Sequence, residues 1–98
     1  MTITKTADTG KLALKVAGRL DTSTAPQLEK ELSESLTGVK ELVMDFQDLE
    51  YISSAGLRVL LSAQKIMNRQ GSMKVTGVNE IVNEIFEITG FSDILTIE

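Results

Sequence analysis

Apolar residues alternate with polar or small residues near the start of the chain, in the pattern of a half-buried β-strand. Leu12, Leu14 and Val16 occupy every second position, and a period of two places them on one face of a strand. The Asp-Thr-Gly at residues 8–10 has the composition of a turn, and residues 2–6 supply an edge strand before it. The chain is therefore predicted to open with a β-hairpin.

The apolar period then lengthens to that of an α-helix in three later segments. These stripes run from Ala25 to Leu36, from Leu57 to Met67 and from Ile81 to Ile88, and each is followed by a stop at Gly38, Gly71 or Gly90. Thr22, Ser23 and Thr24 offer N-cap oxygens before the first helix, and Gln27 can complete a capping box with Thr24. Three helices are expected.

Short apolar segments at residues 42–46, 73–76 and 94–97 are predicted strands, and residues 47–51 are predicted to form a polar connection. Residues 42–46 are apolar on both alternations, which predicts a central strand covered on two faces. The order ββαβαβαβ predicts an α/β fold with a mostly parallel mixed sheet. Helical crossovers join its parallel strands, and the first strand lies antiparallel at the edge. With 98 residues, the whole of 1–98 is expected to form one domain.

Composition excludes most catalytic chemistry and several classes of partner. The chain has no cysteine and no histidine, so cysteine nucleophiles, Ser-His-Asp triads and Cys/His zinc sites are absent, and we expect neither an enzyme nor a bound cofactor or metal. The net charge is −4, and no basic residue follows Lys74, which argues against nucleic acid. No segment is apolar enough for a signal peptide or a membrane span, so a cytoplasmic protein is expected.

One strand-to-helix connection carries unusual residues. Ser53 and Ser54 are followed by Ala55 and Gly56 at the start of the second predicted helix. A structural interpretation makes one of the serines an N-cap. However, glycine in a helix costs about 1 kcal/mol relative to alanine, so helix stability does not explain the glycine at this position. We therefore expect the small residues to leave this helix start open to a partner. The helix N-terminus would also stabilise a phosphoryl group, which makes Ser54 a candidate phosphoacceptor.

Three segments together resemble the STAS domain, specifically the bacterial anti-sigma-factor antagonists. They are Gly18-Arg19-Leu20-Asp21, Leu42-Val43-Met44-Asp45-Phe46, and residues 49–61 with Ser53-Ser54-Ala55-Gly56-Leu57 at their centre. The last group is similar to the family motif Asp-Ser-Ser/Thr-Gly-Leu, which implies that Ser54 is the phosphorylated residue. Ser53 stands where the family usually has aspartate, and it is a rival acceptor.

The resemblance implies a protein-interaction switch. In the family, an anti-sigma factor with serine-kinase activity phosphorylates the antagonist. The unphosphorylated form binds that kinase and frees the sigma factor, and a serine phosphatase resets the cycle. A phosphate adds about −1.5 to −2 charges and three acceptor oxygens, so it can abolish docking on an acidic protein.

The expected partner-binding residues lie around this motif and before the first helix: Asp21, Thr22, Ser53, Ser54, Ala55, Gly56 and Arg58. Asp21 has a structural alternative, because its carboxylate can accept hydrogen bonds from the neighbouring turn. Arg58 is either a surface charge or a partner for a carboxylate or a phosphate. Family members usually end with a further helix, so one face of the sheet is expected to be partly uncovered, with a homodimer or a partner filling it.

Two other functions remain open at the level of sequence. STAS domains also serve as subunits of transporters, lipid-transport complexes and stressosomes, and such a subunit would act by protein binding without phosphorylation. A nucleotide-binding module or enzyme is disfavoured, because the chain has no Gly-Lys-Ser/Thr of a phosphate-binding loop.

Overall fold

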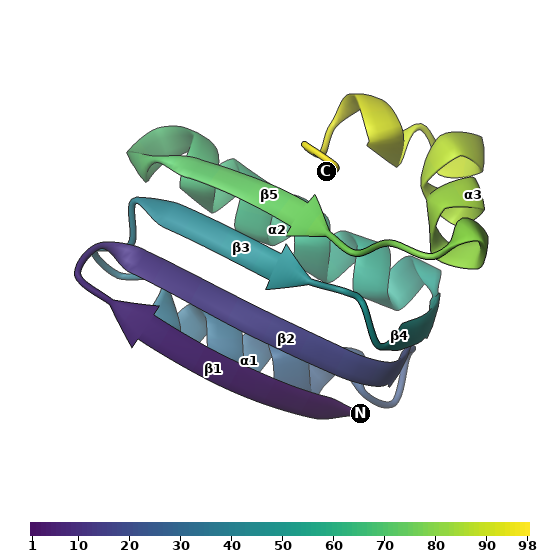
Figure 1. Cartoon of the computed structure of the whole chain (residues 1–98), viewed down its shortest axis with the longest axis horizontal. Helices are drawn as coiled ribbons and strands as arrows, with labels where there is room; N and C mark the ends of the chain where they lie inside the picture. The colour runs from purple at the N-terminus through teal and green to yellow at the C-terminus, as the bar shows by residue number, and fades with distance from the viewer.

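Five strands and three helices form two layers in the computed structural model, which describes residues 1–98 (Figure 1). The elements are β1 (Thr2–Asp8), β2 (Lys11–Leu20), α1 (Ala25–Ser35), β3 (Glu41–Asp45), β4 (Leu49–Ile52), α2 (Ser54–Gln70), β5 (Ser72–Thr76), α3 (Glu80–Thr89) and a short 3₁₀ helix, Phe91–Asp93. No helix is both long and apolar enough to cross a membrane.

The sheet has the order β1-β2-β3-β5, and β4 pairs with the carboxyl end of β2 beyond this path. β1 and β2 form the predicted antiparallel hairpin, and the other pairs are parallel. Leu14 of β2 lies beside Met44 of β3, which lies beside Val75 of β5, and all three side chains are fully buried. This register confirms the predicted mixed α/β sheet with its antiparallel edge strand.

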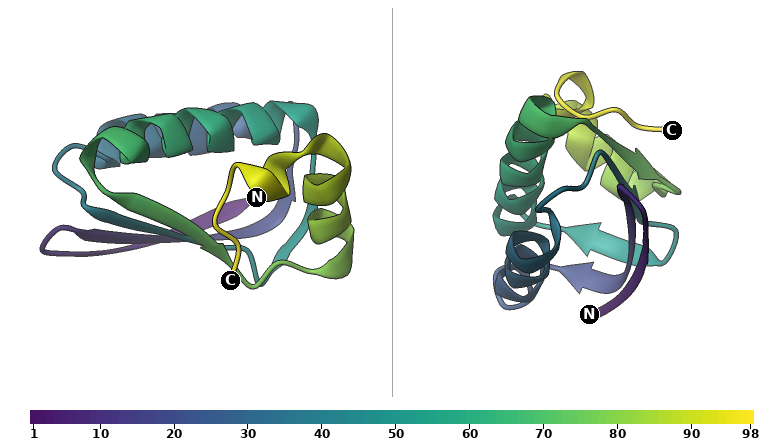
Figure 2. Two further views of the ribbon diagram at one scale, coloured as in Figure 1. Left: turned by 90° about the horizontal axis from the view of Figure 1, so that it is seen from above. Right: turned by 90° about the vertical axis from the view of Figure 1, so that its left-hand side faces the viewer.

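α1 and α2 lie side by side on one face of the sheet, and no helix covers the opposite face (Figure 2). Leu28 and Leu32 of α1 and Leu60 and Met67 of α2 supply the helical half of the core. The prediction that residues 42–46 are covered on two faces is therefore wrong. The strand is interior as expected, but Val43 lies on the uncovered side and is only partly buried.

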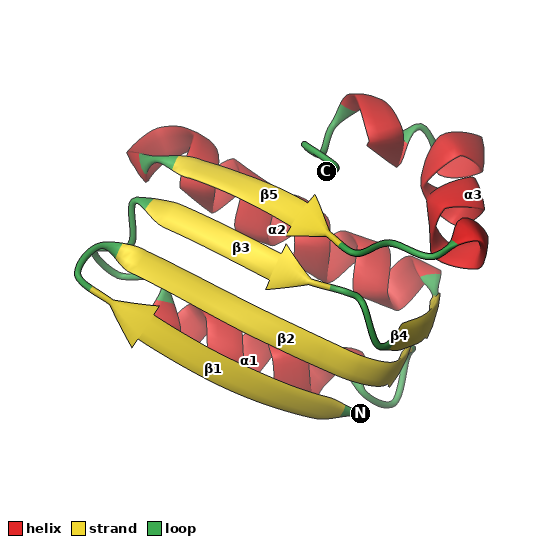
Figure 3. Cartoon of the chain, viewed as in Figure 1, coloured by secondary structure: helices red, strands yellow, loops and turns green.

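α3 sits at the carboxyl end of the sheet, next to β4, rather than on either face (Figure 3). Asn79 joins the two elements. Its Oδ1 accepts a hydrogen bond from the Val82 amide and caps the helix, while its Nδ2 donates to the Leu49 carbonyl (both 2.8 Å). Asn79 thus both caps α3 and attaches the helix to β4.

Two predictions about the connections need correction. Residues 47–51 are not wholly a polar connection, because Leu49–Ile52 forms β4, and the core buries both Leu49 and Ile52. A shift in register between Gly18 and Arg19 lets β2 pair with this extra strand. Residues 94–97 do not form a full strand. The 3₁₀ helix precedes them, and only one parallel bridge, between Val75 and Ile97, joins them to the sheet.

Candidate phosphorylation site and partner-binding surface

Ser53 and Ser54 form the junction between β4 and α2, at the carboxyl end of the sheet. The Ser53 amide donates to the Leu20 carbonyl at the end of β2 (2.9 Å), and the Ser53 carbonyl accepts the first helical hydrogen bond, from Leu57 (3.0 Å). The Ser53 amide therefore bonds to the sheet, whereas its carbonyl bonds to the helix. Its extended conformation, φ −100° and ψ 177°, is that of an N-cap residue.

The two serine hydroxyls have different environments. Ser54 is the first residue of α2 and is exposed. The Ser53 Oγ is buried and has no hydrogen-bond partner. The structural interpretation is confirmed for the backbone, because Ser53 is the N-cap residue of α2, but neither serine hydroxyl accepts a hydrogen bond from the first turn of the helix. Because no side chain caps the first turn, its amide groups are available to an acceptor from outside the chain.

Gly56 has a packing role, and the expectation that it opens the helix start to a partner is wrong. The residue is buried on the core side of α2. A Cβ added there would lie 2.7 Å from both Ile52 Cγ1 and Leu20 Cγ, closer than carbon atoms pack. The missing side chain therefore lets α2 approach the ends of β2 and β4. Of the two small residues, only Ala55 is partly accessible.

Asp21 organises the turn between β2 and α1. Its carboxylate accepts hydrogen bonds from the Ser23 hydroxyl (2.7 Å), the Ser23 amide (3.0 Å) and the Thr24 amide (3.2 Å). These bonds, with that from the Ser23 hydroxyl as the largest contribution, lower the pKa of Asp21. The structural alternative for this residue thus has direct support, and its role toward a partner stays a prediction.

Arg19 and Tyr51 lie beside this turn and were not anticipated from the sequence. They are paired across β2 and β4, and the Arg19 guanidinium lies 4.5 Å from the centre of the Tyr51 ring. The Arg19 Nε is also 3.9 Å from Asp21 Oδ2. The two residues could have been linked only by knowing that residues 49–52 pair with the end of β2, because their separation in the chain gives no local signal.

A shallow groove of about 210 Å³ between α1 and α2 brings together three of the predicted residues. It is lined by Thr22, Ala25, Pro26, Glu29, Ala55, Arg58, Val59 and Ser62. Arg58 is exposed and forms no ion pair within the chain. Thr22, Ala55 and Arg58 therefore line one accessible groove, and Ala55 follows Ser54 directly in the chain.

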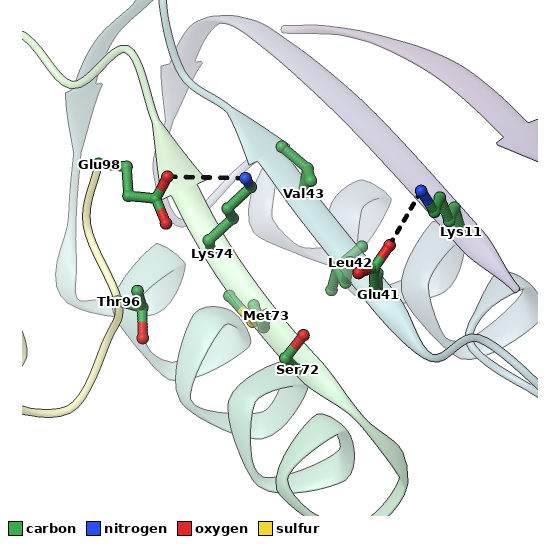
Figure 4. A pocket seen from close by; sticks show the side chains of 9 residues that line it. All are labelled: Lys11, Glu41, Leu42, Val43, Ser72, Met73, Lys74, Thr96 and Glu98. Atoms are coloured by element: carbon green, nitrogen blue, oxygen red, sulfur yellow. Dashed lines mark ion pairs between the residues drawn. The ribbon is translucent and has the colours of Figure 1, made fainter.

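A larger groove, of about 460 Å³, lies toward the opposite, amino end of β3 and β5 (Figure 4). Its two lysines are both paired within the chain, Lys11 with Glu41 (3.4 Å) and Lys74 with Glu98 (3.6 Å). None of the predicted site residues lines it. In addition, no three His, Cys, Asp or Glu side chains are grouped closely enough to hold a metal ion.

Comparisons with known proteins show the family and the fold of this chain. Residues 2–98 match the STAS domain family. An anti-sigma-B factor antagonist of Listeria monocytogenes is 36% identical over 98 residues, with coverage of 96% of this chain and 84% of the relative. The unphosphorylated anti-sigma factor antagonist SpoIIAA has a TM-score of 0.86 at 15% identity, over 99% of this chain and 88% of that chain. The phosphorylated form of the Bacillus SpoIIAA has a TM-score of 0.77 at 14% identity, over 99% and 91%.

The chain therefore belongs to the STAS domain family. Within that family it belongs with the anti-sigma factor antagonists, as its similarity to the Listeria protein along most of both chains shows. The structural neighbours, at lower identity, show the shared fold.

Proposed function

We propose that this chain is a phosphorylation-controlled antagonist of an anti-sigma factor that is itself a serine kinase. The unphosphorylated chain binds the kinase, so that its sigma factor is released, and phosphorylation of Ser54 ends the binding. A serine phosphatase then restores the active form, and the cycle takes place in the cytoplasm. The observation that carries the proposal is the exposed Ser54 hydroxyl at the uncapped N-terminus of α2.

Accessibility favours Ser54 over Ser53 as the acceptor. A kinase must bring the γ-phosphate of ATP in line with the attacking hydroxyl. The exposed Ser54 side chain permits that approach, whereas the Ser53 Oγ is buried. The proposal therefore assigns the phosphate to Ser54 and gives the buried Ser53 no part in the transfer.

Electrostatics explains how one phosphate can change binding without changing the fold. The partial positive charge and free amides at the start of α2 favour an added anion, so the helix is not expected to melt. The chain already has a net charge of −4, and a dianionic group at the centre of a docking surface brings repulsion and desolvation. The expected result is loss of the partner from an intact domain.

The assignment of the acceptor is tested by mass spectrometry after incubation with the anti-sigma factor of the same genome and ATP. The wild type and Ser53→Ala are expected to gain one phosphate, and Ser54→Ala none. Ser33→Ala is a matched control that should gain one phosphate like the wild type, because Ser33 is an exposed helical serine outside the groove between α1 and α2. Labelling of Ser54→Ala to the wild-type level would overturn the assignment.

The consequence for binding is tested by titration calorimetry with the same anti-sigma factor. Ser54→Ala should bind like the wild type, and Ser54→Asp should bind about 100-fold more weakly, which corresponds to about 2.7 kcal/mol. Equal binding of Ser54→Asp and wild type would reject the switch and favour a STAS subunit that acts without phosphorylation.

A further inference from the structure

Helix α3 has a broad apolar side, and only part of it is used by the core. Val82 and Phe86 are fully buried against the rest of the domain. Ile85 is partly buried and packs against the core, whereas Ile81 and Ile88 are large apolar side chains that remain 59% and 77% exposed. The core therefore accounts for the Val82 and Phe86 part of this side and leaves Ile81 and Ile88 unexplained.

The three isoleucines form a continuous stripe. Positions 81, 85 and 88 follow the i, i+4, i+7 spacing, which places them within about 60° of arc on a helix of 3.6 residues per turn. Single exposed apolar residues are common on protein surfaces, but a grouped set marks an interaction surface more often. We call Ile81, Ile85 and Ile88 the isoleucine stripe.

Acidic residues border the isoleucine stripe. Glu80, Glu84 and Glu87 follow the stripe on the side of α3 that is turned away from Val82 and Phe86, and all three are exposed. No basic residue follows Lys74, so nothing on α3 or beyond it balances these charges. An anionic surface such as nucleic acid or an acidic bilayer would be repelled here. A surface with apolar side chains and a border of lysine or arginine would be complementary.

The position of α3 connects the stripe with the candidate phosphorylation site. α3 packs beside β4 and is attached to it through Asn79 and the Leu49 carbonyl. β4 leads directly into Ser53 and Ser54. α3 and the start of α2 therefore occupy the same end of the molecule, as Figures 1 and 2 show, and one partner surface can cover both.

We infer that the isoleucine stripe is a second part of the docking surface for the anti-sigma factor, which meets it with an apolar patch bordered by basic side chains. The inference rests on the proposed function, because it assumes the same partner. It adds a hydrophobic contact that phosphorylation of Ser54 does not change. The isoleucine stripe contributes to the affinity for the anti-sigma factor, and the phosphorylation state of Ser54 controls whether the two proteins bind.

The test measures binding of the same anti-sigma factor to stripe variants. Ile81→Ser combined with Ile88→Ser should weaken binding about tenfold or more, as expected for loss of about 1.4 kcal/mol at an apolar contact. The matched control is Ile66→Ser, which changes a 41% exposed isoleucine on α2 and should leave the affinity unchanged. Glu84→Lys combined with Glu87→Lys should slow association and reduce its dependence on salt. Circular dichroism checks that each variant is folded.

The outcomes separate this inference from the proposed function. If the wild type binds, Ser54→Asp binds weakly and the double serine variant binds like the wild type, the stripe proposal is overturned and the switch stands. If Ser54→Asp binds normally but the stripe variant does not, the switch fails and the docking surface stands. Failure of the wild type to bind overturns both. Two other outcomes would also overturn the inference. The wild type could self-associate through a contact that the stripe variant abolishes, which assigns the stripe to a second copy of the chain. Alternatively, phosphatidylglycerol vesicles could capture the wild type, which assigns the stripe to a lipid surface.

Discussion

The two ends of the sheet differ in whether their polar and apolar groups already have partners. At the amino end, the larger groove contains two lysines, and each is paired with a glutamate of the same chain. At the carboxyl end, an uncapped helix begins at an exposed serine, Arg58 has no ion-pair partner, and the isoleucine stripe faces outward. Groove volume alone would have selected the amino end. The groups without partners at the carboxyl end are what support the proposal that the docking surface lies there.

The largest expected effect on stability concerns the glycine that supports the carboxyl end. Gly56→Ala places a methyl group against Ile52 and Leu20, and overpacking of this kind costs about 1–3 kcal/mol. The better helix propensity of alanine returns about 1 kcal/mol, so a net loss of up to about 2 kcal/mol in the free energy of unfolding is expected. Urea denaturation measures it.

A double-mutant cycle tests the physical reason for that loss. Leu20→Ala removes the Cγ and Cδ2 atoms that a methyl group at position 56 would meet. The cost of Gly56→Ala should therefore be smaller in the Leu20→Ala background than in the wild type. Stabilisation by Gly56→Ala in the wild-type background would show that packing is not why glycine stands there.

A moderate effect is expected at the turn that Asp21 organises. The pKa of Asp21 is lower in the folded chain than in the unfolded chain, chiefly because of the Ser23 hydroxyl. The carboxylate therefore stabilises the fold fully above its unfolded pKa of about 3.9, and this stabilisation is lost as pH falls through the folded value. Ser23→Ala should raise the pKa of Asp21, measured from the carboxyl ¹³C shift by NMR. An unchanged midpoint would contradict the assigned cause.

Periodicity was sufficient to predict the hairpin, the three helices and the interior position of β3, because each depends on local alternation between core and solvent. It could not predict β4. Its four residues pair with β2 only after a shift in register at Gly18 and Arg19, which is a tertiary feature. The candidate site was found through the residues around Ser54, whereas the Arg19 and Tyr51 contact depends on that same unforeseen pairing.

Two features of the helices depend only on helical phase, which the sequence contains. Gly56 precedes Val59, Leu60 and Ala63 by three, four and seven residues, and all three are buried. This spacing alone places the glycine on the core side of α2. In the same way, the apolar residues of α3 spread over about 160° of arc on the helix, so the exposure of Ile81 and Ile88 at one edge of this arc could have been predicted from their spacing.

The smallest expected effect compares a paired and an unpaired cation at the two ends. Lys74→Ala removes an exposed ion pair with Glu98, and such pairs contribute about 0–1 kcal/mol to stability. Its affinity for the anti-sigma factor should equal that of the wild type. Arg58→Ala breaks no ion pair in the free chain, so the free energy of unfolding should change little. Its binding should weaken several-fold, because the exposed guanidinium lines the groove between α1 and α2. Calorimetric titration of both variants measures the difference. Weaker binding by Lys74→Ala than by Arg58→Ala would place the docking surface at the amino end and reverse the comparison.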